Sequence, residues 1–455
     1  MKLTDIKNGN LSAEWAEKGY ELPKFDVEAV KAKTHAEPTW VHFGAGNIFR
    51  AFPAAILNDA LNSGKYDRGV IVAESFDYEI IDKAYQPYDN LSLLVCLKST
   101  GEIEKKVIAS VTESLKADYS FGEDWARLVE IFQNPSLQMI SFTITEKGYA
   151  LYRPDGSLMP VVQADIDEGP AHARHAMSMV AALLFERFQA GAAPLAVVSM
   201  DNCSHNGDKL YAAVNAFAKA WTDNGLVEAG FLGYVNDQTK VTFPWSMIDK
   251  ITPRPDAKVE AMLAEDHIGG LDAVVTSKNT YIAPFVNAEE CEYLVIEDAF
   301  PNGKPALDKG GIIFTDRATV DKVEKMKVCT CLNPLHTALA IYGCLLGYTL
   351  ISEEMKNPLL KNMVEVIGYK EGLPVVVNPR ILDPKKFIDE VVNVRIPNPF
   401  LPDSPQRIAT DTSQKLSIRF GETIKAYEAS PDLHTEDLKL IPLVYACLLY
   451  TSDAA

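Results

Sequence analysis

The sequence has few cysteines, the residues on which small secreted and zinc-stabilised proteins depend. It contains seven cysteines in 455 residues, an odd number, and no two of them form a CxxC pair. A disulfide framework or a zinc ribbon is therefore not the expected basis of the fold, and a reducing cytoplasm is the expected compartment. The opening residues, MKLTDIKNGNLSAEW, lack the apolar stretch of a secretory signal.

Positive charge and long apolar runs are also scarce. Lys and Arg number 44 against 62 Asp and Glu, which gives a formal net charge of −18. This balance argues against nucleic acid or an anionic membrane as a partner, although a few local cations could still hold an anionic small molecule. The most apolar long segment, residues 337–351, is shorter than the roughly 18 residues that cross a bilayer and is expected to be a buried helix.

What is present is an alternation of strand-like and helix-like segments. The apolar run TWVHF (39–43) leads through a glycine-rich turn into a helical pattern over 48–64, and a second apolar run, GVIVAE, follows at 69–74. Strand, helix and strand in this order form a βαβ unit, which builds parallel sheets. Further short apolar runs, expected to be buried strands of such a sheet, occupy 91–97, 139–145 and 194–200. A helix is expected over 169–189.

The sequence pattern changes from strand-rich to helical after about residue 300. A Pro- and Gly-containing stretch at 299–311 precedes a helical portion that begins near Asp316. The expected fold class is α/β, with a Rossmann-like doubly wound NAD-binding domain over residues 1–305. A mostly α-helical substrate and catalytic domain is expected over 306–455.

A possible cofactor turn follows the first predicted strand, in the segment FGAGNIFR. Gly44 and Gly46 would allow a tight turn and a close approach of the backbone to a pyrophosphate, and Asn47 and Arg50 complete the segment. Phe49 occupies the place of the third glycine in the usual fingerprint, so a purely structural turn is the alternative. The position between a strand and a helix favours cofactor binding.

Two acidic residues near the end of the second strand bear on the choice of cofactor. Glu74 is placed to accept hydrogen bonds from an adenosine ribose and to oppose the extra phosphate of NADP, so NAD is predicted. Asp77 competes for this role. The alternative for either residue is a solvated acid on a loop.

A basic, an amide and an imidazole side chain lie close together in the segment KMKVCTCLNPLH. Asn333 and His336 are three residues apart, so on a helix they share a face. A desolvated lysine can act as a base in alcohol dehydrogenation, while an amide and an imidazole donate to the reacting oxygen. The segment contains two lysines that could serve as this base, Lys325 and Lys327.

Several motifs resemble the mannitol dehydrogenase family, the long-chain polyol-specific dehydrogenases. Besides FGAGNIFR and the lysine segment, they are TITEKGY (143–149), SMDNCSHNG (199–207), IDKITPR (248–254) and VRIPNPF (394–400), in the family's order. The resemblance implies that Lys327 is the catalytic base and that Asn333 and His336 polarise the reacting oxygen, without a catalytic metal. It also implies a substrate pocket lined by Asn202, Asp249 and Arg395, with Glu146 on a possible proton route. A structural ion pair is the alternative role of Arg395.

The spacing of the catalytic segment departs from the family. Five residues separate Lys327 from Asn333, where the family usually has four, and a regular helix would turn Lys327 away from His336. Two local geometries would restore the arrangement. Asn333 could cap a helix that begins at Pro334, with Lys327 on a separate segment, or a one-residue bulge could absorb the extra residue.

Other polar residues receive simpler interpretations. His205 is expected to cap a helix or lie on the surface, and His42 to be a satisfied core histidine. Cys329 and Cys331 are expected to be buried thiols and not metal ligands.

The end of the chain also departs from the family. Residues 447–455 have no family counterpart and read like foreign sequence, which predicts that the native C-terminus is missing.

The implied activity is the NAD-dependent interconversion of a keto sugar acid, such as fructuronate, with its polyol acid, mannonate. Mannitol oxidation to fructose is the alternative within the family. A catalytically inactive dinucleotide-binding sensor or scaffold is the alternative of another class. No feature of the sequence specifies an oligomeric state.

Overall fold

The computed structural model describes residues 1–8 and 13–453, which fold as two compact units. The N-terminal unit comprises residues 1–96, 103–288 and 292–317, and the C-terminal unit comprises residues 97–102, 289–291 and 318–455. The division into functional domains at 305/306 stays a prediction.

A six-stranded sheet forms the centre of the N-terminal unit, and each strand is parallel to its neighbours. In order across the sheet the strands are β6 (Val111–Lys116), β3 (Val70–Glu74), β2 (Trp40–Phe43), β7 (Met139–Phe142), β8 (Leu195–Ser199) and β9 (Val241–Thr242). The chain builds outward from β2 in one direction and then from β7 in the other. This is the doubly wound order of a dinucleotide-binding domain, and it confirms the predicted fold class.

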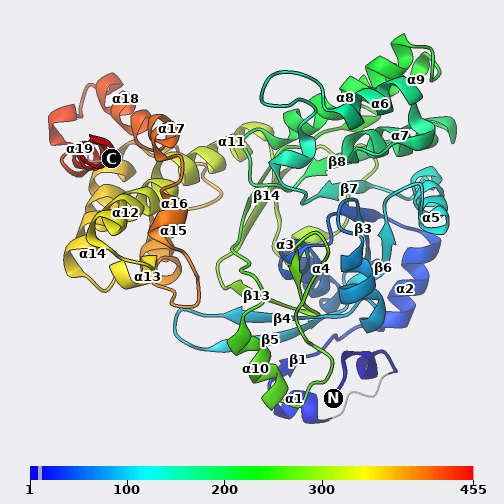
Figure 1. Cartoon of the computed structure of the whole chain (residues 1–455), viewed down its shortest axis with the longest axis horizontal. Helices are drawn as coiled ribbons and strands as arrows, with labels where there is room; N and C mark the ends of the chain where they lie inside the picture. Colours follow the sequence, from blue (N-terminus) through cyan, green and yellow to red (C-terminus); the bar gives the residue numbers. More distant parts are fainter. Residues whose placement is uncertain (9–12, 454–455) are drawn as a thin grey trace. The chain divides into compact units, whose positions relative to one another are not determined.

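Both faces of this sheet are covered, which explains why its central strands are almost continuously apolar. Alternate residues of β2 point to opposite faces: Val41 and Phe43 join one buried cluster and Trp40 joins the other. Helices α5 (Gly122–Gln133), α7 (Ala176–Gln189) and α8 (Asn206–Asp223) cover the first face, and α4 (Pro53–Asn62) covers the second (Figure 1).

The predicted strand at 91–97 forms, but in a different sheet. It is β4 (Ser92–Leu97), in a four-stranded sheet of order β1-β5-β4-β13 with β1 (Tyr20–Glu21), β5 (Ile103–Ile108) and β13 (Phe285–Glu289). The third strand of this half of the parallel sheet is instead β6, whose sequence VTESLK mixes polar and apolar residues because it lies at the edge. Apolar content alone did not distinguish the two sheets.

Two predicted helices have different bounds in the structure. The pattern over 48–64 divides into α3 (Asn47–Ala51) and α4, because Pro53 has no backbone N–H to continue the first helix. The pattern over 169–189 becomes a short 3₁₀ turn, Pro170–His172, followed by α7, whose N-terminus is capped by the His175 side chain.

Smaller elements complete the N-terminal unit. A three-stranded sheet joins β10 (Ser246–Asp249), β14 (Tyr293–Glu297) and β15 (Ile313–Thr315), and a two-stranded one joins β11 (Val274–Val275) and β12 (Tyr281–Ile282). The remaining α-helices of this unit are α1 (Ala13–Glu17), α2 (Val27–Ala36), α6 (Pro160–Glu168), α9 (Gly230–Asn236) and α10 (Ala257–Glu265).

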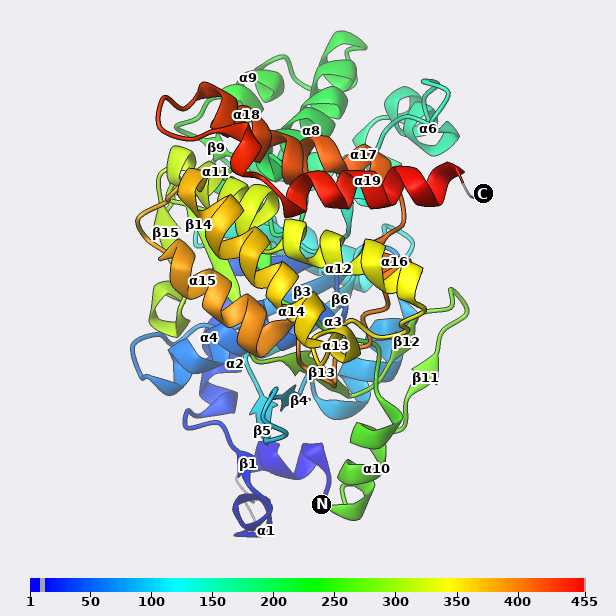
Figure 2. The same ribbon diagram turned by 90° about the vertical axis from the view of Figure 1, so that its left-hand side faces the viewer.

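The C-terminal unit is helical, as predicted. Its α-helices include α12 (Asn333–Leu346), α13 (Ile351–Glu354), α14 (Pro358–Glu365), α15 (Pro384–Glu390), α16 (Pro405–Ile408), α17 (Thr412–Leu416), α18 (Glu422–Ala429) and α19 (Leu440–Asp453). Helix α12 packs against α13, α14, α16 and α19 (Figure 2). The predicted foreign tail at 447–455 continues α19 and extends beyond the described residues.

Helix α11 (Arg317–Met326) begins at the last residue of the N-terminal unit and leads into the C-terminal unit. Together with α12 it forms a helical run, Arg317–Leu346, which is long and apolar enough to cross a bilayer by length and composition. In its most apolar window 61% is buried within the protein, as in the core helix of a folded domain. The predicted buried helix at 337–351 is therefore the end of a longer one, which stops at Gly347 in a left-handed conformation.

Candidate active site

The two glycines of the turn between β2 and α3 have different roles. Gly44 permits a positive φ angle beside a close neighbour, and Gly46 leaves open space next to the backbone. Gly44 has φ +106°, and a Cβ atom there would lie 2.4 Å from the carbonyl oxygen of Thr143, at the end of β7. Gly46 is extended, and a Cβ there would meet nothing within 4 Å. The turn is thus pressed against the neighbouring strand at Gly44 and open at Gly46. This geometry fits the close approach of a pyrophosphate.

The three other residues predicted in this turn support it from within. Phe49 is fully buried and stacks on His42, with ring centroids 4.2 Å apart. Arg50 is also fully buried, and its guanidinium donates to the carbonyl oxygen of Ala283 at 2.6 Å and to the side-chain oxygen of Asn47 at 2.9 Å. The side chains of Phe49 and Arg50 therefore fix the helix that follows the glycines.

Glu74 lies at the end of β3, as the sequence predicts, but its carboxylate is turned into the turn itself. One oxygen accepts the Ala45 N–H at 2.7 Å, and the other accepts the N–H groups of Phe76 and Asp77 at 2.8 and 3.1 Å. Burial raises the pKa of Glu74, and these three bonds oppose the increase. Asp77 is buried as well and accepts from Thr276 at 2.6 Å. Neither acid is a solvated loop residue.

Buried polar side chains link the carboxyl end of β7 to β2 and the carboxyl end of β8 to β10. His42 contacts Ser141 and Thr143 through its two ring nitrogens, at 2.6 and 2.8 Å, and burial lowers its pKa to about 3. It is the satisfied core histidine that the sequence predicts. Asn206 is buried after β8 and donates to the carbonyl oxygens of Ser199 and Ser246, so it ties β8 to β10.

The predicted substrate residues of this unit lie beside these buried polar side chains. Asn202 is exposed in the turn after β8, and Asp249 is buried as the last residue of β10. Sequence reasoning missed the part that Asn206 plays, although it lies within the quoted SMDNCSHNG motif. His205 is exposed at the start of α8 and stacks on Trp245, with centroids 4.2 Å apart, in agreement with the expected surface position.

Glu146 is mostly exposed at the start of a 3₁₀ turn, Glu146–Tyr149, which follows β7. Its carboxylate accepts from Lys209 of α8. Both residues line an open groove, together with Tyr149 and Tyr152.

A π-helical turn, Lys327–Cys331, separates α11 from α12 in the C-terminal unit. Its defining bond runs from the Leu332 N–H to the Lys327 carbonyl oxygen, five residues back, at 3.1 Å. A π turn holds one residue more than an α turn. Of the two geometries expected from the sequence, the structure contains the one-residue bulge. Asn333 is the first residue of α12, and Leu332 takes the capping position.

The two candidate lysines lie in opposite surroundings. Lys327 is 2% exposed, whereas the Lys325 side chain is 53% exposed and forms an ion pair with Asp321 at 2.7 Å. The hydrogen bond that Lys325 donates to Asp321 raises the pKa of Lys325, which keeps this amine protonated. Burial raises the pKa of the Cys329 and Cys331 thiols to about 11 and about 12, so both stay protonated. Within residues 1–8 and 13–453, no three His, Cys, Asp or Glu side chains gather as a metal site.

Two carboxylates that the sequence reasoning did not single out contact predicted site residues in the C-terminal unit. Asp403 is buried and lies 3.8 Å from Nε2 of His336. Glu289 forms a buried ion pair with Arg395 at 2.7 Å. Neither carboxylate has a local sequence signal, because each lies far from its partner along the chain.

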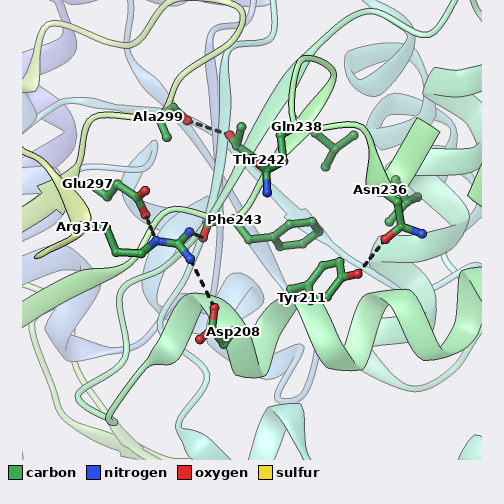
Figure 3. Close-up of a pocket in the computed structure, with 11 residues that line it drawn as sticks. Asp208, Tyr211, Asn236, Gln238, Thr242, Phe243, Glu297, Ala299 and Arg317 are labelled. Carbon is green, nitrogen blue, oxygen red and sulfur yellow. Dashed lines mark hydrogen bonds and ion pairs between the residues drawn. The ribbon is translucent and has the colours of Figure 1, made fainter. Parts of the chain in front are cut away.

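A separate cavity of about 280 Å³ lies next to the edge strand β9 (Figure 3). Arg317 extends between Asp208 of α8 and Glu297 of β14, at 3.6 and 2.9 Å, and its guanidinium lies 5.0 Å from the centre of the Trp245 ring. The cavity is lined by none of the predicted site residues. Arg317 pairs with both carboxylates, and these contacts anchor the start of α11.

The strand order and the glycine turn define a Rossmann-type dinucleotide-binding protein. The chain belongs to the mannitol dehydrogenase family. Residues 38–309 match the mannitol dehydrogenase Rossmann domain, and residues 319–453 match the mannitol dehydrogenase C-terminal domain. The family resemblance found in the sequence motifs is therefore confirmed.

Curated relatives include two D-mannonate oxidoreductases. The protein of Thermotoga maritima is 56% identical over 436 residues, which cover 95% of this chain and 80% of the relative. The protein of Escherichia coli K12 is 28% identical, with 86% of this chain and 78% of the relative covered. A mannitol 2-dehydrogenase of Cereibacter sphaeroides is 29% identical, with 86% and 76% covered.

Two solved structures share the fold along most of the chain. A D-sorbitol dehydrogenase in substrate-free form has a TM-score of 0.79 at 24% identity, covering 95% of this chain and 82% of its own. The Pseudomonas fluorescens mannitol 2-dehydrogenase, in a ternary complex with NAD and D-mannitol, has a TM-score of 0.73 at 26% identity, covering 98% and 83%.

Proposed function

We propose that the protein is an NAD-dependent oxidoreductase of the D-mannonate oxidoreductase type, which interconverts a keto sugar acid and its polyol acid. The observation that carries this proposal is the 56% identity to the Thermotoga maritima D-mannonate oxidoreductase over 95% of the chain. The Escherichia coli D-mannonate oxidoreductase and the Cereibacter sphaeroides mannitol 2-dehydrogenase are about equally similar to this chain, at 28% and 29% identity. The choice of mannonate over mannitol therefore rests on the Thermotoga maritima relative.

The cofactor proposed for the glycine turn is NAD. The open space above Gly46 and the tight turn at Gly44 would admit the pyrophosphate, and Glu74 fixes this turn through the Ala45 N–H. When bound, the nicotinamide group accepts or donates hydride at the carbinol carbon. The solved mannitol 2-dehydrogenase complex with NAD supports this choice.

Lys327 is the proposed base for the substrate hydroxyl. Its burial supports this role, because removal from water disfavours the charged form of an amine. Asn333 and His336 would donate hydrogen bonds to the oxygen on which negative charge develops. Asp403, which contacts His336, would orient the imidazole.

Arg395, Asn202 and Asp249 are proposed to hold the substrate, and Glu146 to exchange the released proton with solvent. For Arg395 the buried pairing with Glu289 supports the structural alternative as well, and a variant pair described below separates the two. No metal takes part in this proposal. The expected location is the cytoplasm, and the partner is a small sugar acid.

A panel of substrates tests the proposal. Oxidation of NADH should be measured with fructuronate, tagaturonate, fructose and fructose phosphates, and fructuronate is expected to give the highest kcat/KM. Preference for fructose would favour the mannitol 2-dehydrogenase alternative. NADH binding without turnover of any of these compounds would favour a catalytically inactive sensor or scaffold.

A further inference from the structure

A buried carboxylate at the end of β8 holds a strained turn at the end of β7. Thr145 has φ +66° and ψ 160°, a backbone conformation that is essentially restricted to glycine and is especially unfavourable for a β-branched residue. Such a conformation persists only where surrounding contacts enforce it. Asp201 supplies these contacts, because its two oxygens accept the N–H groups of Ile144 and Thr145 at 3.0 and 2.8 Å.

A third bond completes the anchoring of this turn. The Tyr149 hydroxyl donates to Asp201 at 2.6 Å and lies 2.8 Å from the Ser199 hydroxyl. Burial and the neighbouring carboxylate raise the pKa of Tyr149 far above its ordinary value, so the phenol stays protonated and remains a donor. Asp201 is 9% exposed and therefore interacts with the protein and little with water. One carboxylate thus fixes both ends of the segment Ile144–Tyr149.

The position of this turn gives it a functional meaning. Strand order reverses between β2 and β7, and dinucleotides bind outside the carboxyl ends of the strands at such a point. The half built from β2, β3 and β6 receives the adenosine part, and the half built from β7, β8 and β9 receives the nicotinamide part. Thr143, two residues before Thr145, is already in close contact with Gly44.

We infer that Asp201 is a positioning residue for the nicotinamide half of the cofactor site, which it shapes by holding Thr145 in its strained conformation. The inference rests on the proposed function. Asp201 is not proposed to contact the nicotinamide or the substrate, because its carboxylate already accepts hydrogen bonds from Ile144, Thr145 and Tyr149. Asn202, which follows directly in the chain, carries the predicted substrate contact, so the same anchor also orders that residue.

The test compares two ligands that differ only in the nicotinamide group. Dissociation constants for NADH and for ADP-ribose should be measured on the full chain and on Asp201→Asn. The amide presents an N–H group where the carboxylate accepted one, so Kd for NADH should rise about tenfold, the cost of about one charge-assisted hydrogen bond. Kd for ADP-ribose should stay within about twofold, because the adenosine half of the sheet is unchanged.

Relief of strain provides the rescue. Glycine adopts positive φ without an anchor, so Thr145→Gly in the Asp201→Asn background should recover most of the NADH affinity and of kcat. Asp155→Asn is the matched control, since Asp155 also accepts a backbone N–H and a hydroxyl, from Ser157, but on the surface. This control should leave both constants unchanged.

The possible outcomes are distinct. Equal weakening of NADH and ADP-ribose, no weakening of either, or no rescue by glycine would each overturn the inference. If Asp201→Asn does not fold, Tyr149→Phe removes the hydroxyl contacts to Asp201 and Ser199 and keeps the two N–H bonds of the turn, so it should show the same difference between the ligands on a two- to threefold scale. Failure of the unmodified protein to bind either ligand would instead overturn the proposed function, and the inference with it.

Discussion

The Leu332 N–H donates to the carbonyl oxygen of Lys327 at 3.1 Å, and this bond makes room for one extra residue in the helix that carries the proposed catalytic groups. A turn closed five residues back holds one residue more than an α turn, so the residues after it keep their rotational position. With this turn, five residues between Lys327 and Asn333 span the same helical rotation as four residues in a regular α-helix. The spacing that distinguishes this chain from its family is compensated locally.

The bulge predicts an asymmetry between deletion and insertion. Deletion of Val328 should convert the π turn into an α turn and leave kcat within about tenfold, because the catalytic groups keep their phase. Insertion of an alanine at the same place should rotate Asn333 and His336 by about 100° relative to Lys327 and abolish turnover. Steady-state kinetics on both variants, with circular dichroism to verify the helix, provide the measurement. Equal activities would contradict this account.

The burial of Lys327 predicts that it, and not Lys325, is the base. Lys327→Ala should lower kcat by about 10²- to 10⁴-fold, the usual contribution of a general base. Lys325→Ala is the matched control and should leave kcat near its original value, because this side chain is exposed and paired with Asp321. The assignment is wrong if only the Lys325 variant loses activity.

The two glycines of the cofactor turn should respond differently to the same substitution. Gly44→Ala should destabilise the protein by about 2 kcal/mol or more, because the new methyl group meets a carbonyl oxygen at 2.4 Å and φ is positive. Gly46→Ala should leave the melting temperature unchanged and weaken NADH binding, since its Cβ would occupy the open space proposed for the pyrophosphate. Thermal unfolding and NADH titration distinguish the two effects. Unchanged NADH affinity in Gly46→Ala would place the cofactor elsewhere.

The Arg395–Glu289 pair allows structural and substrate roles to be separated. Arg395→Leu alone should cost about 3–5 kcal/mol of stability, since it leaves Glu289 as a buried charge. The double variant Arg395→Leu/Glu289→Leu should recover most of this stability. If Arg395 binds the substrate carboxylate, the double variant should still show a KM for fructuronate raised about 10- to 100-fold. An unchanged KM would make the residue purely structural.

Stability of the C-terminal unit should depend on the ionisation of Glu354. This residue is fully buried on α13, neither of its carboxyl oxygens has a hydrogen-bond partner among the described residues, and burial raises its pKa from 4.5 to about 8. Below pH 4.5 the carboxyl group is neutral in both the folded and the unfolded state. Between pH 4.5 and about 8 the unfolded state loses its proton more readily, so stability falls as the pH rises through this range.

A neutral isostere should remove that dependence. Glu354→Gln is expected to flatten the decrease in melting temperature between pH 5 and pH 8.5 and to be the more stable protein at the upper end, by about 1 kcal/mol or more. Differential scanning calorimetry across this range is the measurement. Parallel curves for the two proteins would show that Glu354 is not ionising in this interval.

The features that the sequence predicted correctly are those set by residues close together in the chain. Strands β2, β3, β7 and β8 were predictable because strands buried on both faces must be apolar along their whole length. The turn at Gly44 was predictable because only glycine tolerates both its φ angle and its close neighbour. The extra residue before Asn333 was visible as a count, and a bulge was one of two ways to accommodate it.

Other features depended on partners far apart in the sequence. The apolar segment at 91–97 could not be assigned to a sheet, because pairing with β5 and β13 is decided by tertiary packing. The same holds for the ion pair between Arg395 and Glu289, 106 residues apart, and for the hold of Asp201 on Thr145, 56 residues away.

The sequence by itself determined the doubly wound class of the sheet half, the helical character of the second half and the family, because periodicity and short motifs are local properties of the chain. Tertiary structure alone decided which polar groups are buried and what each of them contacts. Glu74 illustrates the difference. Its position at the end of a strand could be predicted from the sequence, but its three backbone hydrogen-bond partners could not. A carboxylate's role depends on the donors that surround it, and folding brings those donors together from separate segments.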